Sequence, residues 1–204
     1  MKKYKNIVFD IGQVLMGYRW MDMLVDDYGM SNEKAKEFGE TIFSDKLWLE
    51  FDRGVRDYWD IAAEYENRYP QLKEVLHWFF SNAKLMRVTR PDVWEKVGKL
   101  KEKGYKIYLL SNYSKKLLDD HAGDASFWDY VDGAIVSYMV HELKPDAPIY
   151  KALFDKYNLE PSECLFLDDR EANVEGSKKV GMDSIIIESK EQLLGLLDDL
   201  LSVM

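Results

Sequence analysis

Acidic side chains that could do chemistry stand where apolar, strand-like segments of this sequence end. Asp10 follows the first such segment, and Gly12 comes two residues later, where the backbone can turn or approach a ligand. Asp168 and Asp169 follow a later apolar segment. Adjacent carboxylates repel each other, and at a buried strand end they are costly without a cation. Taken alone, Asp10 fits a functional carboxylate, a helix cap or a paired structural residue.

Polar side chains that could bind anionic oxygens follow two other segments. Ser111 and Asn112 end one apolar segment, and Lys144 is followed by Pro145, which fixes the backbone. Each signal is weak by itself, because serine and asparagine end many strands and lysine is usually solvated surface. If these strand ends share one sheet edge, three carboxylates, a hydroxyl, an amide and an ammonium meet there.

This set of side chains favours a hard cation over zinc or a nucleotide loop. Magnesium prefers a few carboxylates together with waters and phosphate oxygens. The three histidines, His77, His121 and His141, have no paired metal spacing, and the single cysteine, Cys164, cannot form an intramolecular disulfide. No glycine-rich nucleotide loop of the GxxxxGK[ST] or GxGxxG type is present. The residues therefore predict a Mg²⁺ ion that is bound by oxygen atoms of carboxylates, water and phosphate.

The elements that must position these side chains are short apolar runs bounded by polar residues. Such runs predict buried strands at residues 6–11, 106–111, 134–137, 165–167 and 184–187. Helical patterns separate them, for instance a helix that begins at Pro91 and closes near Gly104. Alternating strands and helices predict an α/β fold, a Rossmann-like doubly wound parallel sheet with helices on both faces. The leucine-rich residues 192–203 predict a helix that packs on this core or forms a dimer contact.

The alternation is interrupted between Gly17 and Val88, a gap far longer than the usual connection in a βα unit. Helical patterns fill this gap at residues 32–38, 55–69 and 72–82, without a strand of alternating pattern. We therefore predict two units. Residues 1–16 and 89–204 form the α/β core, and residues 17–88 form a small inserted α-helical module.

Bulk composition limits the partners of the chain. The 204 residues are 47% hydrophobic and 32% charged, which is ordinary for a soluble globular protein. The net charge of −9 repels nucleic acid and anionic lipid, so a phosphate-bearing substrate must be drawn in by a local positive site. The opening residues reach Asp10 before any long apolar run, which predicts neither a secretory signal nor a membrane span. We expect a cytoplasmic monomer or homodimer.

The order of these motifs resembles that of the haloacid dehalogenase-like (HAD) superfamily, in the branch that carries a helical cap after the first motif. The resemblance covers nearly the whole chain. It rests on Asp10 with Gly12 and Val14, then Ser111-Asn112, then Lys144-Pro145-Asp146, then Asp168-Asp169 with Asn173. Each motif is loose, but four of them in this order with a helical insertion in the right gap are a specific combination. The inserted module would then be the cap.

The resemblance implies a phosphoryl-transfer reaction with defined roles. The residue in the place of Asp10 attacks the phosphoryl group and forms an aspartyl-phosphate, which water hydrolyses. Ser111 and Lys144 would hold the transferring oxygens, and Asn112 would contact phosphate or substrate. The chemistry of aspartate is consistent with this nucleophilic role. An aspartate with the reference pKa of about 3.9 is ionised at neutral pH and needs no adjacent base to act as a nucleophile.

The resemblance also implies the ligands of a magnesium ion. Asp169 would bind the metal directly, with Asp168 beside it or acting through water. Asp10 and the backbone carbonyl of Gly12 would complete the protein ligands, and Asn173 would hold an outer-shell water. Magnesium and one lysine can neutralise the equatorial oxygens, which is the main demand of phosphoryl transfer.

Two residues depart from the family pattern. The family usually has an aspartate two residues after the nucleophile as general acid, whereas this chain has Gly12. Capped members with glycine there include phosphatases that act on sugar 1-phosphates. His141 stands where relatives commonly have glycine, and a core or surface role is the simpler interpretation, although an imidazole is able to transfer protons.

The sequence thus predicts a Mg²⁺-dependent phosphatase that acts on a small phosphorylated metabolite, such as a sugar phosphate. Two alternatives remain open. A non-catalytic phosphate-binding or regulatory protein is favoured by Gly12. A haloacid dehalogenase would use the same nucleophile without a metal, but the paired Asp168 and Asp169 would repel the departing halide.

Overall fold

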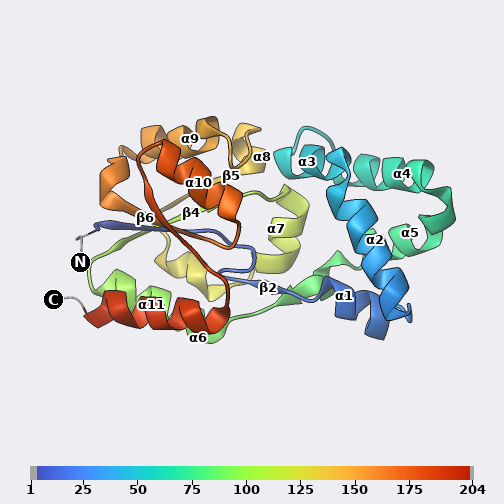
Figure 1. The fold of residues 1–204 in the computed structure, drawn as a ribbon, viewed down its shortest axis with the longest axis horizontal. Helices are drawn as coiled ribbons and strands as arrows, with labels where there is room; N and C mark the ends of the chain where they lie inside the picture. The colour runs from blue at the N-terminus through green and yellow to red at the C-terminus, as the bar shows by residue number, and fades with distance from the viewer. Residues whose placement is uncertain (1–3, 203–204) are drawn as a thin grey trace.

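A five-stranded parallel sheet forms the centre of the protein (Figure 1). The structure is a computed structural model that describes residues 4–202. Its strands, in spatial order, are β5 (Gly133–Val136), β4 (Lys106–Ser111), β1 (Asn6–Phe9), β6 (Cys164–Asp168) and β7 (Asp183–Ile186). The five predicted strands are confirmed; β4 has the predicted bounds, and the ends of the other four differ by at most two residues.

Helices cover both faces of this sheet, as predicted for a doubly wound fold. In Figure 1, α9 and α10 lie on one face, and α6 and α11 lie on the other. The helices that accompany the sheet are α6 (Pro91–Glu102), α7 (Lys115–Ala122), α8 (Ser137–Val140), α9 (Ala147–Tyr157), α10 (Glu171–Lys179) and α11 (Lys190–Ser202), with short 3-10 turns at Ser126–Tyr130 and Pro161–Glu163. The predicted α/β class is therefore confirmed.

The two faces of the sheet bury alternate residues of the same strands. On β1, Ile7 and Phe9 join the cluster that includes α6 and α11, whereas Val8 joins the cluster beneath α9. Because both faces are covered by helices, every position of the central strand is apolar or buried. This two-sided burial explains why the strands appear in the sequence as continuous apolar runs.

The segment between Gly17 and Val88 is almost entirely helical. Its elements are β2 (Gly17–Tyr18), α1 (Trp20–Asp22), a π-helical turn (Met23–Asp27), α2 (Asn32–Ser44), α3 (Lys46–Arg53), α4 (Tyr58–Arg68), a 3-10 turn (Pro70–Leu72), α5 (Lys73–Ser81), a second 3-10 turn (Ala83–Met86) and β3 (Arg87–Val88). Figure 1 shows these helices beyond one end of the sheet. Strands β2 and β3 pair antiparallel where the chain leaves and re-enters the sheet region. These two-residue strands are too short to give an alternating pattern, so they were not predicted.

Side-chain caps determine where the helices of this segment begin. Asp45 Oδ1 accepts a hydrogen bond from the Leu47 backbone N–H at 2.8 Å, which begins α3. Asp57 caps α4 in the same way through the Trp59 N–H. The helix predicted from residue 55 therefore starts later, and α3 is an additional helix. The division into a core (1–16 and 89–204) and an inserted module (17–88) stays a prediction, and residues 1–3 and 203–204 of that core lie outside the described residues.

The leucine-rich C-terminal segment forms α11 and packs against α6. Leu193, Leu197 and Leu200 are buried in the core cluster, in agreement with a packing helix. The predicted end at residue 203 lies outside the described part of the chain. Between residues 4 and 202, no helix combines the length and the apolar character needed to cross a lipid bilayer.

Candidate active site

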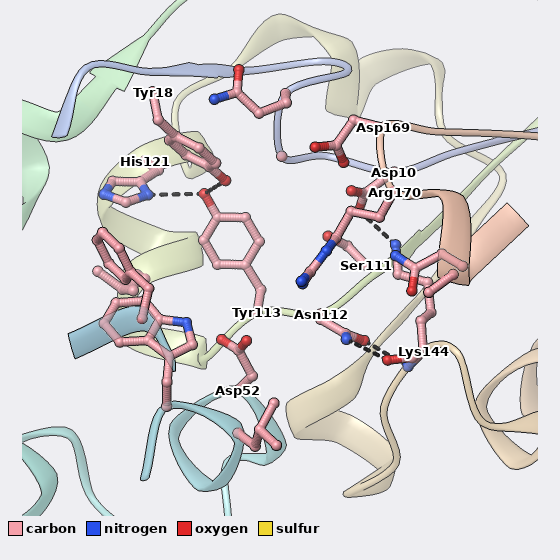
Figure 2. Close-up of a pocket in the computed structure, with 18 of the residues that line it drawn as sticks. Asp10, Tyr18, Asp52, Ser111, Asn112, Tyr113, His121, Lys144, Asp169 and Arg170 are labelled. Carbon is pink, nitrogen blue, oxygen red and sulfur yellow. Dashed lines mark hydrogen bonds and ion pairs between the residues drawn. The ribbon is translucent and has the colours of Figure 1, made fainter. Parts of the chain in front are cut away.

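Residues from three neighbouring strands meet at the carboxyl edge of the sheet. Asp10 follows β1 directly, Ser111 is the last residue of β4, and Asp168 is the last residue of β6. Because β4 and β6 pair with β1 on either side, the register places these side chains next to one another. Asp10 and Ser111 line a cavity of about 510 Å³ between the sheet edge and the helical segment, shown in Figure 2.

Lys144 is the buried cation of this edge. Its Nζ lies 2.9 Å from Asp10 Oδ1 and 2.6 Å from Asp168 Oδ2, and it donates a hydrogen bond to the Leu110 carbonyl at 2.9 Å. Burial alone would lower the pKa of Lys144, but the two carboxylates outweigh it and raise the pKa above its ordinary value. The lysine therefore stays charged while only 4% exposed.

Asn112 fixes the backbone that carries Lys144. Its amide Nδ2 donates to the Lys144 carbonyl at 3.0 Å, and its Oδ1 accepts from the Lys144 N–H at 2.9 Å (Figure 2). The side chain was predicted to contact phosphate or substrate. In the structure both ends of its amide bond the lysine backbone instead, although Asn112 also lines the cavity.

Asp168 is held by four hydrogen bonds and is completely buried. Its Oδ1 accepts from the Arg170 N–H at 2.8 Å and from Asn173 Nδ2 at 2.9 Å. Its Oδ2 accepts from Lys144 Nζ and, at 3.1 Å, from Asn173. These partners occupy both carboxylate oxygens, so Asp168 positions Lys144 and Asn173 in this geometry.

The carboxylates of this edge form a set suited to a divalent cation. One oxygen each of Asp10, Asp168 and Asp169 lies within 4.8 Å of the others. Asp10 Oδ1 is buried and accepts no hydrogen bond from any described residue, although the Lys144 ammonium lies 2.9 Å from it as an ion pair. A hard cation coordinated by oxygen would satisfy this atom. Gly12 lines the same cavity.

Burial and charge repulsion oppose ionisation of Asp10. Burial raises its pKa to about 7, with further increases from Asp168 and Asp169, while Lys144 and a hydrogen bond from Ser111 oppose the shift. The pKa of Asp169 is likewise raised, mainly by burial and then by Asp168. A cation at this edge would favour the ionised carboxylates, because it replaces repulsion with attraction.

Tyr18 fills the space beside Gly12. A Cβ atom at residue 12 would lie 2.9 Å from Tyr18 Oη, so the hydroxyl occupies the space into which a side chain there would point. Tyr18 Oη donates a short hydrogen bond to Tyr113 Oη, which lies 2.8 Å from His121 Nδ1 (Figure 2). Burial raises the pKa of both tyrosines and lowers that of His121, so all three are neutral.

Two charged residues line the cavity without having been predicted. Asp52 comes from α3, and Arg170 follows β6. Figure 2 shows Asp52 pointing into the cavity from the wall opposite Asp10 and Asp169, with Arg170 extending into the space between. Burial raises the pKa of Asp52 to about 7, Arg170 and Lys144 lower it, and Asp10 raises it further. No strand end or motif marks Asp52 in the sequence, so only the tertiary structure identifies it.

His141 lies away from the cavity wall. Its Nδ1 is 2.8 Å from the Arg53 carbonyl, and its side chain is otherwise exposed. The residue has φ +57° and ends α8 in the left-handed conformation, which favours glycine. The structure therefore gives His141 a structural contact with α3, in agreement with the non-catalytic interpretation.

Comparison with protein-family models gives one match over most of the chain. The model described as a haloacid dehalogenase-like hydrolase matches residues 4–181. The matched region contains every residue of the sheet edge described above, from Asp10 to Asn173.

Characterised proteins with similar sequences include phosphatases. A sesquiterpene phosphatase of Aspergillus oryzae is 27% identical over 88% of this chain and 87% of its own length. Flavin mononucleotide hydrolase 1 of Arabidopsis thaliana is 24% identical over 98% of this chain and 78% of its own length. A drimenol cyclase of Aspergillus calidoustus is 24% identical, and the chain spans only 35% of its length.

Solved structures with the same fold are more distant in sequence. A predicted HAD-like hydrolase of Porphyromonas gingivalis superimposes over the full length of both chains with a TM-score of 0.75 and 19% identity. A HAD family enzyme of Bacteroides thetaiotaomicron, solved with magnesium and inorganic phosphate, has a TM-score of 0.71 at 20% identity and covers 92% of this chain and 96% of its own. L-2-haloacid dehalogenase of Xanthobacter autotrophicus has a TM-score of 0.68 at 18% identity over 92% of this chain and 80% of its own. At these identities the likeness shows the fold.

Proposed function

Because this chain belongs to the haloacid dehalogenase-like hydrolase family, we propose that it is a magnesium-dependent phosphatase with Asp10 as its nucleophile. The observation that carries the proposal is the environment of the Asp10 carboxylate. It lines the cavity, and its Oδ1, which accepts no hydrogen bond from residues 4–202, lies 2.9 Å from the Lys144 ammonium. A buried carboxylate with an unsatisfied oxygen beside a fixed cation is suited to attack an electrophilic phosphorus atom.

Asp10, Asp169 and the Gly12 carbonyl are the groups that would hold Mg²⁺. The ion is a hard Lewis acid that neutralises charge on phosphoryl oxygens when bound. Its use by HAD hydrolases agrees with the carboxylate cluster of this chain. Asp168 supports the site through Lys144 and Asn173, because its own oxygens are already bonded.

The remaining residues of the sheet edge bind and orient the phosphoryl group. Ser111 offers its hydroxyl and Lys144 its ammonium, and these two groups approach Asp10 from neighbouring elements. Asn112 acts on substrate through Lys144, whose backbone it fixes. Asp10 attacks phosphorus in line with the leaving oxygen, and water then hydrolyses the aspartyl-phosphate.

Residues 17–88 are the proposed cap that selects the substrate. Four aromatic side chains of this segment, Tyr18, Trp20, Phe43 and Trp48, line the cavity. Such a wall can pack on the apolar face of a small organic group, including a sugar ring. The substrate class proposed is a small phosphorylated metabolite, for which a sugar phosphate is one example. The names of two relatives, a sesquiterpene phosphatase and a flavin mononucleotide hydrolase, indicate other organic groups to compare.

The test is phosphate release from a panel of monoesters that spans these classes, with excess Mg²⁺ and with a chelator. We expect turnover that requires the metal and differs widely between members of the panel. Absence of phosphate release from every monoester would leave a phosphate-binding role as the better account.

A dehalogenase is the second candidate, because solved dehalogenases share this fold. Asp169 beside Asp10 disfavours it, since a departing halide would meet a second carboxylate. Incubation with 2-haloacids, with halide release measured in the absence of metal, separates the two activities. Halide release without phosphate release would replace the phosphatase proposal.

A further inference from the structure

The leaving oxygen of a phosphate monoester needs a proton, and residue 12 cannot supply it. Gly12 has no side chain, and the space that one would occupy is filled by Tyr18 Oη. The hydroxyl of Tyr18 is therefore the first candidate for the missing acid. Its usefulness depends on where its proton points.

The hydrogen-bond chain behind Tyr18 directs that proton away from the cavity. His121 Nε2 lies 2.9 Å from the Ala83 carbonyl, which can only accept, so the ring carries its proton on Nε2. The other ring nitrogen, Nδ1, then accepts from the Tyr113 hydroxyl. The Tyr113 oxygen in turn accepts from Tyr18. Tyr18 therefore presents a lone pair to the cavity and has no proton free for a leaving group.

The other titratable groups of the cavity can be sorted by position. Asp10 is the proposed nucleophile, and Asp169 lies beside it in the proposed metal site. Lys144 is fixed between the carboxylates of Asp10 and Asp168. Arg170 has a guanidinium that does not give up its proton near neutral pH. Asp52 is the remaining carboxyl among the cavity-lining residues, and it projects from the opposite wall (Figure 2).

We propose that Asp52 of α3 is the general acid of this enzyme and replaces the aspartate that Gly12 lacks. The inference rests on the proposed phosphatase function. In-line attack by Asp10 places the leaving oxygen on the far side of phosphorus, which is the side of the cavity that Asp52 occupies. As the bond from Asp10 to phosphorus forms and the bond from phosphorus to the leaving oxygen breaks, the Asp52 proton passes to that oxygen.

The same residue completes the second step. The ionised Asp52 takes one proton from the attacking water as its oxygen bonds to phosphorus. The bond from Asp10 to phosphorus then breaks and returns the free carboxylate. Phosphate leaves, and Asp52 is again protonated. No oxidant or other co-reactant is needed.

The sheet side of the protein holds α3 in the position that this role requires. The Ser137 hydroxyl donates to the Asp52 carbonyl at 2.5 Å, and His141 Nδ1 contacts the next carbonyl, that of Arg53, at 2.8 Å. Gly54 ends α3 with φ +65°, and a Cβ there would lie 2.5 Å from the Tyr138 Cβ. These three contacts lock the end of α3 against α8, so Asp52 keeps a fixed direction relative to Asp10.

The electrostatic environment supports a carboxyl that carries a proton near neutral pH. Burial is the largest influence and raises the pKa of Asp52 to about 7. Arg170 and Lys144 favour the ionised form, and Asp10 opposes it. The neutral hydroxyls of Tyr18 and Tyr113 are the other titratable groups that line this part of the cavity. A general acid works best when its pKa is close to the working pH.

The experiment compares leaving groups of graded pKa in the wild type, in Asp52→Asn and in Glu50→Gln. Glu50→Gln is the control, because it also changes a carboxylate to an amide on α3. Glu50 forms an ion pair with Arg56 on the surface. With Mg²⁺ present, we expect Asp52→Asn to lose roughly 10²–10⁴-fold in kcat/KM for alkyl phosphates. Aryl phosphates with acidic leaving groups should lose far less, because they need no proton. Glu50→Gln should match the wild type throughout.

Two kinetic results would overturn the assignment. Equal losses for alkyl and aryl phosphates would indicate a structural role for Asp52, and the absence of any loss in Asp52→Asn would exclude it as the acid. A wild-type protein that releases no phosphate contradicts the phosphatase function itself, which is a separate outcome. Carboxyl NMR of the metal-free wild type gives a second measurement, with the Asp52 resonance identified by its loss in Asp52→Asn. A pKa near 7 supports the proposal, and a pKa below 5 contradicts it, because an ionised carboxylate has no proton to donate.

Discussion

Lys144 Nζ lies 2.6 Å from Asp168 Oδ2, and both side chains are almost completely buried. This pair holds the ammonium 2.9 Å from Asp10. The charge that would meet a phosphoryl group is thus fixed in the protein before any ligand binds, so binding requires little reorganisation. The cost of desolvating such charges is compensated only while all partners are present.

Removal of the lysine charge should destabilise the protein strongly. Lys144→Met leaves Asp10 and Asp168 buried without their cation, and breaking a buried pair in this way costs about 3–5 kcal/mol of the free energy of unfolding. Urea denaturation in chelator measures the loss. The double variant Lys144→Met/Asp168→Asn should recover part of it, since one unpaired charge is removed. Additive losses in the double variant would mean that the two residues do not interact energetically.

Magnesium should raise the melting temperature in a concentration-dependent way. A ligand that binds only the native protein stabilises it by about 2.7 kcal/mol at a hundredfold excess over its Kd. Asp169→Asn should abolish the shift, whereas Glu95→Gln on the exposed face of α6 should preserve it. Identical melting curves in chelator and in excess magnesium would contradict a metal site at this edge.

Asp52 should make the metal-free protein less stable as the pH rises. Its pKa is raised to about 7 in the folded protein, above the value in the unfolded chain, so the folded state favours the protonated form. This contribution is fully present at low pH and is lost as the pH rises through 7. Asp52→Asn should therefore be more stable than the wild type near pH 8 and equally stable near pH 4, with the pH range set by the ordinary pKa of about 3.9. Denaturation in chelator at the two pH values measures this difference, and equal effects of the substitution at both would disprove the shift.

Gly12 should not accept a side chain while Tyr18 is in place. A Cβ at residue 12 would lie 2.9 Å from Tyr18 Oη and 3.1 Å from its Cε2, so Gly12→Ala should cost about 1–3 kcal/mol through overpacking. In a Tyr18→Phe background the nearest atom is gone, and the same substitution should cost less. Urea midpoints of the four proteins measure the coupling. A Gly12→Ala cost that is independent of Tyr18 would show that the tyrosine does not fill this space in solution.

The sequence predicted the sheet well because its strands are buried on both faces. Val8, Tyr108 and Phe166 pack on one side, and their neighbours pack on the other, so the apolar runs have no helical period. Boundaries in the helical segment were less accurate. Because Asp57 is the N-cap residue of α4, this helix begins later than the sequence predicted. The pairing of β2 with β3 joins residues about 70 positions apart, which no local pattern reveals.

The site was predictable where it follows strand ends and not where it depends on packing. Asp10, Ser111 and Asp168 were found because parallel strands end at one edge. The hydrogen bonds of Asn112 to the Lys144 backbone, the Tyr18 hydroxyl beside Gly12 and the position of Asp52 depend on contacts between distant segments. The predicted role of Asn112 as a direct phosphate contact stays a prediction, and its amide geometry favours a positioning role.

The central claim is that the Asp10 carboxylate attacks phosphorus. The most direct measurement is single-turnover phosphate release by the wild type and by Asp10→Asn in excess Mg²⁺, with acid-quenched samples analysed by mass spectrometry. We expect the wild type to release phosphate and to carry a transient phosphoryl group on the peptide that contains Asp10. We expect Asp10→Asn, confirmed as undeamidated, to form no such adduct and to lose several orders of magnitude in rate, because an amide is a poor nucleophile. Turnover by Asp10→Asn at a rate near that of the wild type would contradict the account.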